Sequence, residues 1–200
     1  VRFEEGAGKM EGLRILLQSR SGSIGGSGGT APVKPDGSFV LQNMAADDYR
    51  FSILGLAEDC YLKAVRLGGM NVLDRSLDLT QGDVPGPIEV VLSAAGGRVE
   101  GTVLQDNQQP AAGATVVLVP DSGRRHRPDL FRSTVADDSG NFVLRGIPPG
   151  EYRLLAWEDV ESGAWLDADF LRGFERSGET LSISERSRHK PQLKVIQAGT

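Results

Sequence analysis

Cysteine and histidine are nearly absent from this chain of 200 residues, which has one cysteine and two histidines. The lone Cys60 excludes a disulfide within the chain, and we expect it to be a buried or half-buried small hydrophobe. His126 and His189 lie in polar, turn-rich segments, outside any HxxE, HExxH or CxxC pattern, so the sequence predicts no zinc site. Neither histidine belongs to a recognisable catalytic set of a nucleophile, a general base and a residue that orients the base, so we expect no catalytic residue. We also expect no cofactor.

Long apolar runs and excess positive charge are also lacking. No stretch of about 18 apolar residues occurs, so the sequence predicts no membrane span. The formal net charge is −5, which gives no basic field for a phosphate backbone and argues against a nucleic-acid partner. Apolar residues make up 39% of the chain, which is enough for a buried core.

Glycine and proline are abundant, with 26 and 10 residues respectively, and they separate short apolar runs, as in a β protein with many turns. Part of this pattern occurs twice, at an offset of 103 residues. Between "GSFVLQNMAADDYR" at 37–50 and "GNFVLRGIPPGEYR" at 140–153, six of fourteen positions are identical. A self-match at one domain length predicts tandem copies of a fold rather than a solenoid.

The repeated segment reads as strand, turn and strand. In the second copy Phe142 and Leu144 share one strand face, and Pro148 and Pro149 end that strand. A new strand begins at Tyr152, so we expect a β-hairpin with a slightly long loop and, as a hypothesis, a tyrosine corner. The equivalent residues of the first copy are Phe39, Leu41 and Tyr49.

Alternating apolar residues predict further strands at 1–5, 13–18, 61–67, 88–92, 98–104, 114–119, 133–136, 181–184 and 192–196. A short helix is expected at 165–175, capped by Asp167, with Phe170, Leu171 and Phe174 on one side. The fold class is therefore all-β: two tandem immunoglobulin-like Greek-key sandwiches, with one short helix in the second. We place the domains at 1–96 and 97–200, joined by the short "SAAGG" at 93–97.

Two stretches carry a family resemblance: "GRVEGTVLQDNQQPAAGATVVLV" and, after it, "ADDSGNFVLRGIPPGEYRLLAWED". Together they resemble the carboxypeptidase regulatory-like domain, a transthyretin-like seven-stranded sandwich found beside metallocarboxypeptidase catalytic domains and, often in tandem, in bacterial surface and secreted proteins. The resemblance is close over 97–200 and looser over 1–96, where "AADDY" replaces "PPGEY". "YLKAVRLGGMNVLD" and "AWEDVESGAWLDADFLRGFE" are similar to segments of multi-domain acidobacterial proteins. The resemblance implies an accessory module without a reaction, located extracellularly, at the cell surface or in the periplasm.

One loop stands out as a candidate binding surface. Arg124, Arg125, His126 and Arg127 form a local cation cluster in an acidic protein, which suits an acidic partner or an anionic glycan. Trp165 is a candidate platform for a sugar ring. The plainer interpretation of the cation cluster is a solvated loop tip. The plainer interpretation of Trp165 is a side chain that closes the core beneath the helix. In "DDSGN", the side-chain oxygens lack the EF-hand spacing, so we expect an Asx turn rather than a calcium site.

The leading functional hypothesis is a non-catalytic structural or interaction module whose partners are the other domains of a larger extracytoplasmic bacterial protein. One alternative is a carbohydrate- or peptide-binding module that uses its loop tips. Another is a subunit that assembles with copies of itself through edge strands. Because the sequence begins inside a predicted strand at Val1, we interpret residues 1–200 as a piece of something longer, and whether the first strand is truncated stays open.

Overall fold

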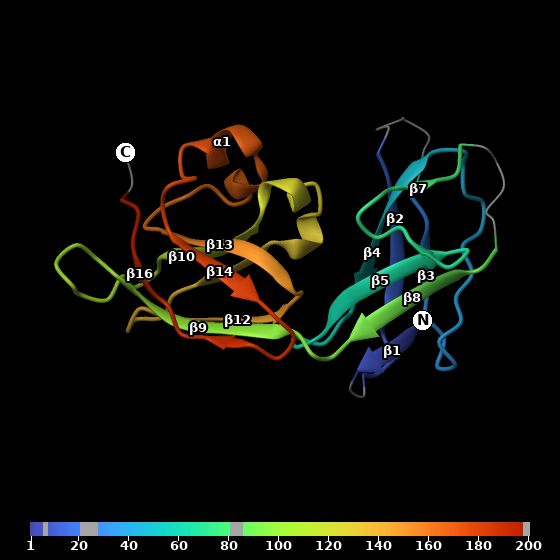
Figure 1. Cartoon of the computed structure of the whole chain (residues 1–200), viewed down its shortest axis with the longest axis horizontal. Helices are drawn as coiled ribbons and strands as arrows, with labels where there is room; N and C mark the ends of the chain where they lie inside the picture. The colour runs from blue at the N-terminus through green and yellow to red at the C-terminus, as the bar shows by residue number, and fades with distance from the viewer. Residues whose placement is uncertain (6–7, 21–27, 81–85, 198–200) are drawn as a thin grey trace. The chain divides into compact units, whose positions relative to one another are not determined.

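The computed structural model describes residues 1–5, 8–20, 28–80 and 86–197. The chain divides into two compact units, Val1–Ala95 and Gly96–Thr200 (Figure 1). Each unit contains two β-sheets, and the helical turns all lie in the second unit within the described residues. The predicted all-β fold class is confirmed. No helix in the described part of the chain has the length and apolar composition needed to cross a membrane.

The first unit pairs its strands in two four-stranded sheets. One sheet has the order β1 (Arg2–Glu5), β8 (Ile88–Ser93), β5 (Tyr61–Leu67) and β6 (Met70–Asn71). The other has the order β3 (Thr30–Pro32), β2 (Arg14–Ser19), β4 (Asp48–Leu54) and β7 (Leu77–Asp78). Strand β1 runs parallel to β8, whereas the other neighbours in both sheets are antiparallel.

The core of the first unit lies between its two sheets. Alternate residues of β2 and β4 point inward, including Ile15, Leu17 and Tyr49, which are fully buried. They meet Val90 and Leu92 of β8 in the same cluster. Both sheets therefore bury one apolar face against the other, which is the arrangement of a β-sandwich.

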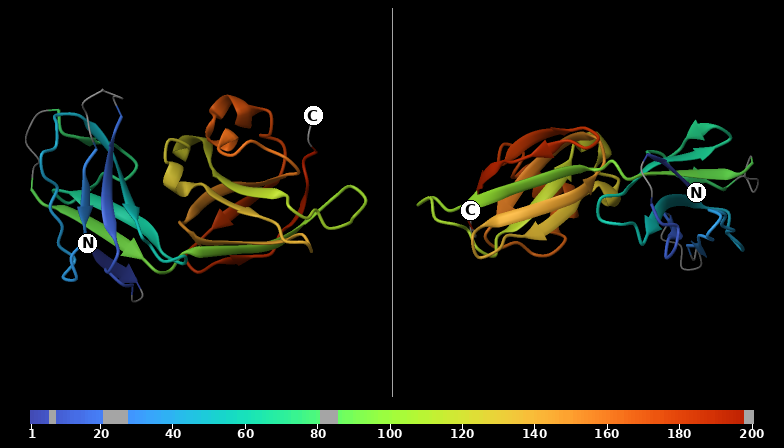
Figure 2. Two further views of the ribbon diagram at one scale, coloured as in Figure 1. Left: turned by 180° about the vertical axis from the view of Figure 1, so that it is seen from behind. Right: turned by 90° about the horizontal axis from the view of Figure 1, so that it is seen from below.

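The second unit is also a two-layered sandwich (Figure 2). One sheet has the order β11 (Arg132–Val135), β10 (Thr115–Pro120), β13 (Gly150–Trp157) and β14 (Glu179–Ile183). In the other, β9 (Gly97–Leu104) lies between β12 (Asn141–Ile147) on one side and β15 (Arg188–His189) and β16 (Gln192–Lys194) on the other. The core between the sheets contains Val99, Leu118, Phe142 and Leu154.

A second apolar layer covers the outer face of β10 and β13, where α1 (Ala168–Arg172) lies in Figure 1. Trp157 is buried there, with its ring centroid 5.9 Å from that of Phe170 and 5.3 Å from that of Phe174. Asp167 caps the helix by accepting hydrogen bonds from the backbone nitrogens of the second and third residues that follow it. The predicted helix and its cap are confirmed, although the α-helical part is five residues long and follows a 3-10 turn, Ala164–Leu166.

The predicted β-hairpin is wrong. Strand β12 pairs with β9, whereas β13 pairs with β10 and β14 in the opposite sheet. The connection at Pro148 and Pro149 therefore crosses from one layer to the other. Both flanking strands point alternate side chains into the same core, as Phe142 and Tyr152 show. The alternation of apolar residues therefore predicts the inward faces correctly. It contains no information about which strand each of them pairs with.

The first unit differs from the prediction in the segment that was expected to contain Phe39 and Leu41 as a strand. Residues 33–47 form no strand, and the two side chains are only partly buried. In the second unit the equivalent residues, Phe142 and Leu144, lie in β12 and are 3% and 4% exposed. In the second unit β12 is paired along its length with β9.

Candidate functional site

The loop between β10 and β11 carries the predicted cation cluster and is built from two short 3-10 turns, Ser122–Arg124 and Pro128–Leu130. Asp121 caps the first turn, because its carboxylate accepts a hydrogen bond of 3.0 Å from the Gly123 nitrogen. A proline opens the second turn, where its missing N–H costs no hydrogen bond. The sequence thus determines an ordered loop rather than a plain tip.

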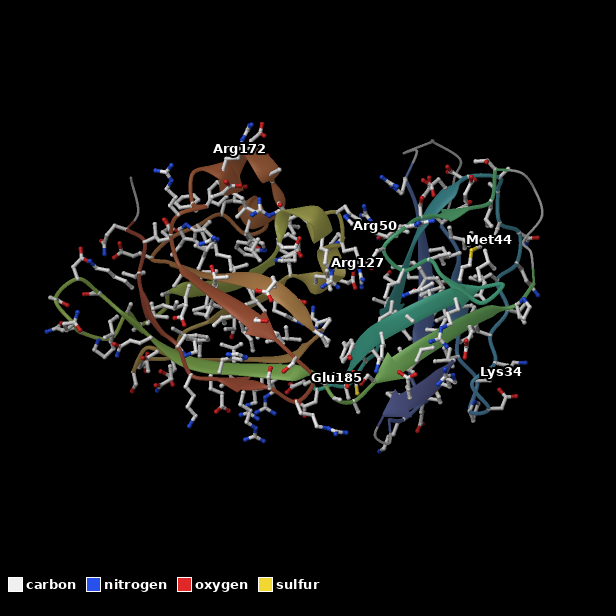
Figure 3. All side chains as sticks on the ribbon, viewed as in Figure 1. Lys34, Met44, Arg50, Arg127, Arg172 and Glu185 are labelled. Atoms are coloured by element: carbon white, nitrogen blue, oxygen red, sulfur yellow. The ribbon has the colours of Figure 1, made fainter. Side chains whose placement is uncertain are left out.

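Three arginines fix this loop, two of them through bonds to the connection before β13 and to β12 and one through an ion pair within the loop. Arg124 donates to the Pro149 carbonyl oxygen at 3.0 Å, across the connection that precedes β13. Gly150 follows that proline, and a Cβ atom there would collide with the Arg124 guanidinium. Arg127, whose side chain is 5% exposed, pairs with both carboxylate oxygens of Asp129 at 3.2 and 2.6 Å (Figure 3).

Arg132, at the start of β11, is the third of these arginines and was not among the residues predicted from sequence. It donates to the carbonyl oxygens of Asp129 at 2.6 Å, Phe131 at 3.0 Å and Gly146 at 3.1 Å. Burial lowers the pKa of its guanidinium, and the Asp129 carboxylate opposes that shift. No signal in the sequence distinguishes this arginine from others that begin a strand.

Tyr152 lies beneath the arginines. Its hydroxyl donates to the Pro148 carbonyl oxygen at 2.9 Å, and its side chain is buried. Burial raises the pKa of the Tyr152 hydroxyl to about 12, although the positive charges of Arg124, Arg132 and Arg127 act in the opposite direction. The neutral hydroxyl therefore serves as a hydrogen-bond donor that holds the turn before β13.

A polar pocket of about 280 Å³ opens beside the loop on the outer face of β13. Arg125, whose side chain is 19% exposed, reaches it, with Nε 3.4 Å from the Pro120 carbonyl oxygen and one terminal nitrogen 3.6 Å from a Glu175 carboxylate oxygen. Glu151 and Arg153 project outward from β13 at alternate positions. The full lining is Pro120, Asp121, Ser122, Arg125, Glu151, Tyr152, Arg153, Glu175 and Thr180.

The chemistry of this pocket suits a polar ligand. Carboxylates accept hydrogen bonds and guanidinium groups donate them, so the lining offers both kinds of group within one small volume. A hydroxyl-rich sugar or a short peptide with both amide groups and charges presents the complementary set. A purely anionic ligand is less well matched, because Asp121, Glu151 and Glu175 share the pocket with its two arginines.

Comparison with known families gives a direct match for this unit. Residues 98–160 match the carboxypeptidase regulatory-like domain. The matched segment includes β9, the loop at 121–131, β12 and β13, and therefore most of the pocket lining. The resemblance inferred for the second unit is confirmed, whereas a second copy of this domain in the first unit stays a prediction.

Several solved structures are similar to this chain over part or most of its length. A candidate carbohydrate-binding protein from Pseudomonas aeruginosa is 16% identical, with a TM-score of 0.31, over 50% of this chain and 88% of that one. The minor pilin of Streptococcus agalactiae is 11% identical, with a TM-score of 0.37, over 95% and 83%. Klebsiella pneumoniae 5-hydroxyisourate hydrolase is 23% identical, with a TM-score of 0.30, over 52% and 87%. No curated protein sequence matches the chain.

The second unit does not bring all the predicted binding residues together. Arg125 lines the pocket, whereas Arg124 and Arg127 are turned toward their own chain. His126 is exposed, with Nδ1 3.0 Å from the Gly123 carbonyl oxygen. Trp165 is partly buried against the aromatic layer around Trp157 and is not part of the pocket lining.

Sequence reasoning missed the pocket residues that come from β13 and from the segments after α1. Alternation along β13 places Glu151 and Arg153 on the face opposite Tyr152, so their outward direction could have been predicted. Their closeness to Arg125 depends on the pairing of β10 with β13 and could not. Among the described residues, no group of three or more His, Cys, Asp or Glu side chains is placed to hold a metal ion.

Proposed function

We propose that this chain is a non-catalytic interaction module of a larger extracytoplasmic bacterial protein. The observation that carries the proposal is the way Arg124, Arg127 and Arg132 are used. All three hold backbone carbonyls or a neighbouring carboxylate, so the loop beside the pocket is fixed before any ligand arrives. Such preorganisation favours recognition, because less conformational entropy is lost on binding. The extracytoplasmic location rests on the family resemblance.

The ligand class that we propose for the module is a glycan or a short peptide bound in the polar pocket. Arg125 supports this proposal, since it is the one residue of the predicted cluster that lines the pocket, and Arg153 faces the same volume. Trp165 lies on the neighbouring aromatic layer and is the second predicted contact.

Binding assays on single variants test this proposal. We expect glycan-array or peptide-array binding that falls at least tenfold in Arg125→Ala and in Arg153→Ala. Arg172→Ala is the matched control, because Arg172 is exposed, pairs with Asp169 on α1 and does not line the pocket. The variant Trp165→Ala tests whether the aromatic layer contributes to ligand binding. Binding that is equal in Arg125→Ala and in the unchanged chain would contradict the proposed site.

A second candidate function is assembly through sheet edges. Strands β11 and β12 are the outermost strands of their sheets, and each carries an exposed valine, Val135 at 62% and Val143 at 40%. An open edge with apolar side chains can pair with a strand of another copy. Light scattering over a concentration series tests this alternative. An apparent molar mass that rises with protein concentration, and no longer rises in Val143→Lys, would support assembly through the edge. A molar mass that stays at the monomer value at every concentration would contradict it.

A further inference from the structure

The sheet of the second unit that contains β9 has one face in the core and one outer face. Alternate residues point into the core, including Val99 of β9, Phe142 of β12 and Leu193 of β16. The residues between them point outward. In Figure 1, α1 and the two 3-10 turns before β11 lie on the far side of the unit, next to the other sheet. They therefore leave this outer face uncovered.

The outward residues form a surface that we call the basic face. They come from β9, from the start of β12 and from the segment 188–194, which contains β15 and β16. Four of the ten members are cations and one is an acid, whereas the whole chain has a net charge of −5. The members are Arg98, Glu100, Thr102, Leu104, Asn141, Val143, Arg188, Lys190, Gln192 and Lys194.

The cations of the segment 188–194 stand in a row. Arg188, Lys190 and Lys194 are exposed and occupy even-numbered positions of an extended segment, so they point in the same direction. The last of them, Lys194, forms an exposed ion pair of 2.6 Å with Asp106. At about 3.3 Å per residue the row is roughly 20 Å long. A row of this length suits an extended ligand better than a compact ion.

The protein itself compensates the positive charge of the basic face only in part. Arg188 stands directly opposite Arg98 in the parallel pairing of β15 with β9, so two like charges lie side by side. Arg98 forms an ion pair with Glu100. Within the described residues, the side chains of Arg188 and Lys190 make no hydrogen bond and no ion pair. An anion bound beside them would reduce the repulsion, so the basic face is complementary to negative charge.

Uncharged polar side chains lie among the cations. Thr102 stands opposite Asn141 on one side and opposite Gln192 on the other. One hydroxyl and two amides therefore cross the sheet in a line, and all three groups can donate and accept hydrogen bonds, as the hydroxyls of a sugar do. The basic face thus offers groups for charges beside groups for hydroxyls, and a polysaccharide with acidic sugar units presents both.

Other polyanions fit the basic face less well. None of its ten members is aromatic, so it offers no ring on which a nucleic-acid base could stack. Its apolar members are Leu104 and Val143. Two separate aliphatic side chains form no apolar cluster that could enter a lipid surface or anchor a folded acidic protein.

We propose that the basic face binds a linear polysaccharide whose sugar units carry carboxylates. The polysaccharide lies along the segment 188–194, where its carboxylates contact Arg188 and Lys190, and its hydroxyls exchange hydrogen bonds with Thr102 and Gln192. This site is separate from the polar pocket, which is lined by residues beside the other sheet of the unit. It therefore does not depend on the ligand proposed for that pocket.

Isothermal titration calorimetry of the full chain with polygalacturonate, a linear polyuronate, tests the proposal. We expect binding at low salt, with an affinity that falls at least about fivefold in Arg188→Gln/Lys190→Gln, because two exposed charges are lost. The matched control is Arg172→Gln/Arg176→Gln, which changes the net charge equally at exposed positions on and just after α1. This control should bind polygalacturonate as the unchanged chain does.

Two further measurements separate the basic face from simpler explanations. The methyl ester of polygalacturonate has the same backbone without the charge, and we expect it not to bind the unchanged chain. Raising the salt concentration from about 50 mM to about 200 mM should weaken binding of the acid form, because exposed charges are screened. Arg125→Ala alters the polar pocket and should leave polygalacturonate binding unchanged, so the failure of one proposed site can be distinguished from the failure of the other.

Four outcomes would overturn the proposal. One is no binding of polygalacturonate to the unchanged chain at low salt, and another is equal binding of its methyl ester. The third is an equal loss of affinity in the two double variants, which would mean that net charge rather than the basic face determines binding. The fourth is tighter binding of a single-stranded DNA oligomer, of phosphatidylserine vesicles or of polyglutamate that is lost in Arg188→Gln/Lys190→Gln, which would assign the face to another class of partner.

Discussion

Tyr49 and Tyr152 make equivalent hydrogen bonds in the two units. Each is buried at the second or third position of a strand, and each donates its hydroxyl hydrogen to the carbonyl oxygen four residues earlier. In the second unit the bond fixes the chain where it passes from β12 in one sheet to β13 in the other, and in the first unit it fixes the segment that precedes β4. In the second unit the acceptor is Pro148, whose neighbour Pro149 accepts from Arg124, so one tyrosine and one arginine together hold the connection.

Removing the hydroxyl of Tyr152 should destabilise the second unit. In Tyr152→Phe the Pro148 carbonyl loses its partner in a buried position, and we expect a loss of about 1–2 kcal/mol in the free energy of unfolding. That corresponds to a fall of roughly 4–8 °C in Tm for each kcal/mol in a domain of this size. Tyr49→Phe is the matched control and should lower the stability of the first unit instead. Unaltered unfolding of Tyr152→Phe would contradict the role given to this bond.

Alkaline pH should weaken the second unit through the same hydroxyl. The pKa of Tyr152 is raised to about 12 in the folded protein, whereas a tyrosine in an unfolded chain titrates near 10. Between these values the unfolded state has lost a proton that the folded state still binds, so stability is complete below about pH 10 and falls as pH rises toward 12. Thermal melts from pH 9 to 12 measure the slope, and Tyr152→Phe should reduce it. An equal slope in the variant would show that other groups cause the loss.

At the scale of elements, the short helix α1 depends on the aromatic layer for its stability. Five residues are too few for a stable isolated helix, so its position depends on Leu171, which is 2% exposed, and on the rings of Phe170 and Phe174 against Trp157. The layer belongs to the outer face of β10 and β13, separate from the core between the sheets.

Leu171→Ala should therefore loosen α1 and expose Trp157. We expect the free energy of unfolding to fall by about 2–4 kcal/mol if the layer unfolds together with the unit. We also expect a red shift of tryptophan emission, because the indole becomes exposed to water. Leu166→Ala is the control, because Leu166 lies in the adjacent 3-10 turn and is 53% exposed. Emission that moves equally in both variants, or in neither, would argue against a layer held by Leu171.

The elements also show what the sequence could and could not predict. Alternation and turn residues located the strands of the repeat and the inward faces of Phe142 and Tyr152, because both follow from local geometry. The partners of β12 and β13 did not follow, since pairing is a contact between segments distant in the chain. For the same reason Arg125 was found as part of a cation cluster, whereas its neighbours Glu151 and Glu175 in the pocket were not.

At the scale of the whole molecule, each unit has a core of its own. The buried cluster around Leu92 draws only on residues 13–92, and the one around Leu118 draws only on residues 99–195. The segment that matches the carboxypeptidase regulatory-like domain, residues 98–160, lies in the second of these units. The account of the interaction module depends on this separation, because the polar pocket is lined by residues of the second unit alone.

Differential scanning calorimetry of two matched core variants tests that separation most directly. Leu92→Ala and Leu118→Ala remove the same atoms from fully buried positions, one in each unit. Each should lower the free energy of unfolding of its own unit by about 2–5 kcal/mol. The account predicts that Leu92→Ala lowers the Tm of one transition only, and that Leu118→Ala lowers the Tm of the other only. A single transition that both substitutions lower to the same extent would contradict it.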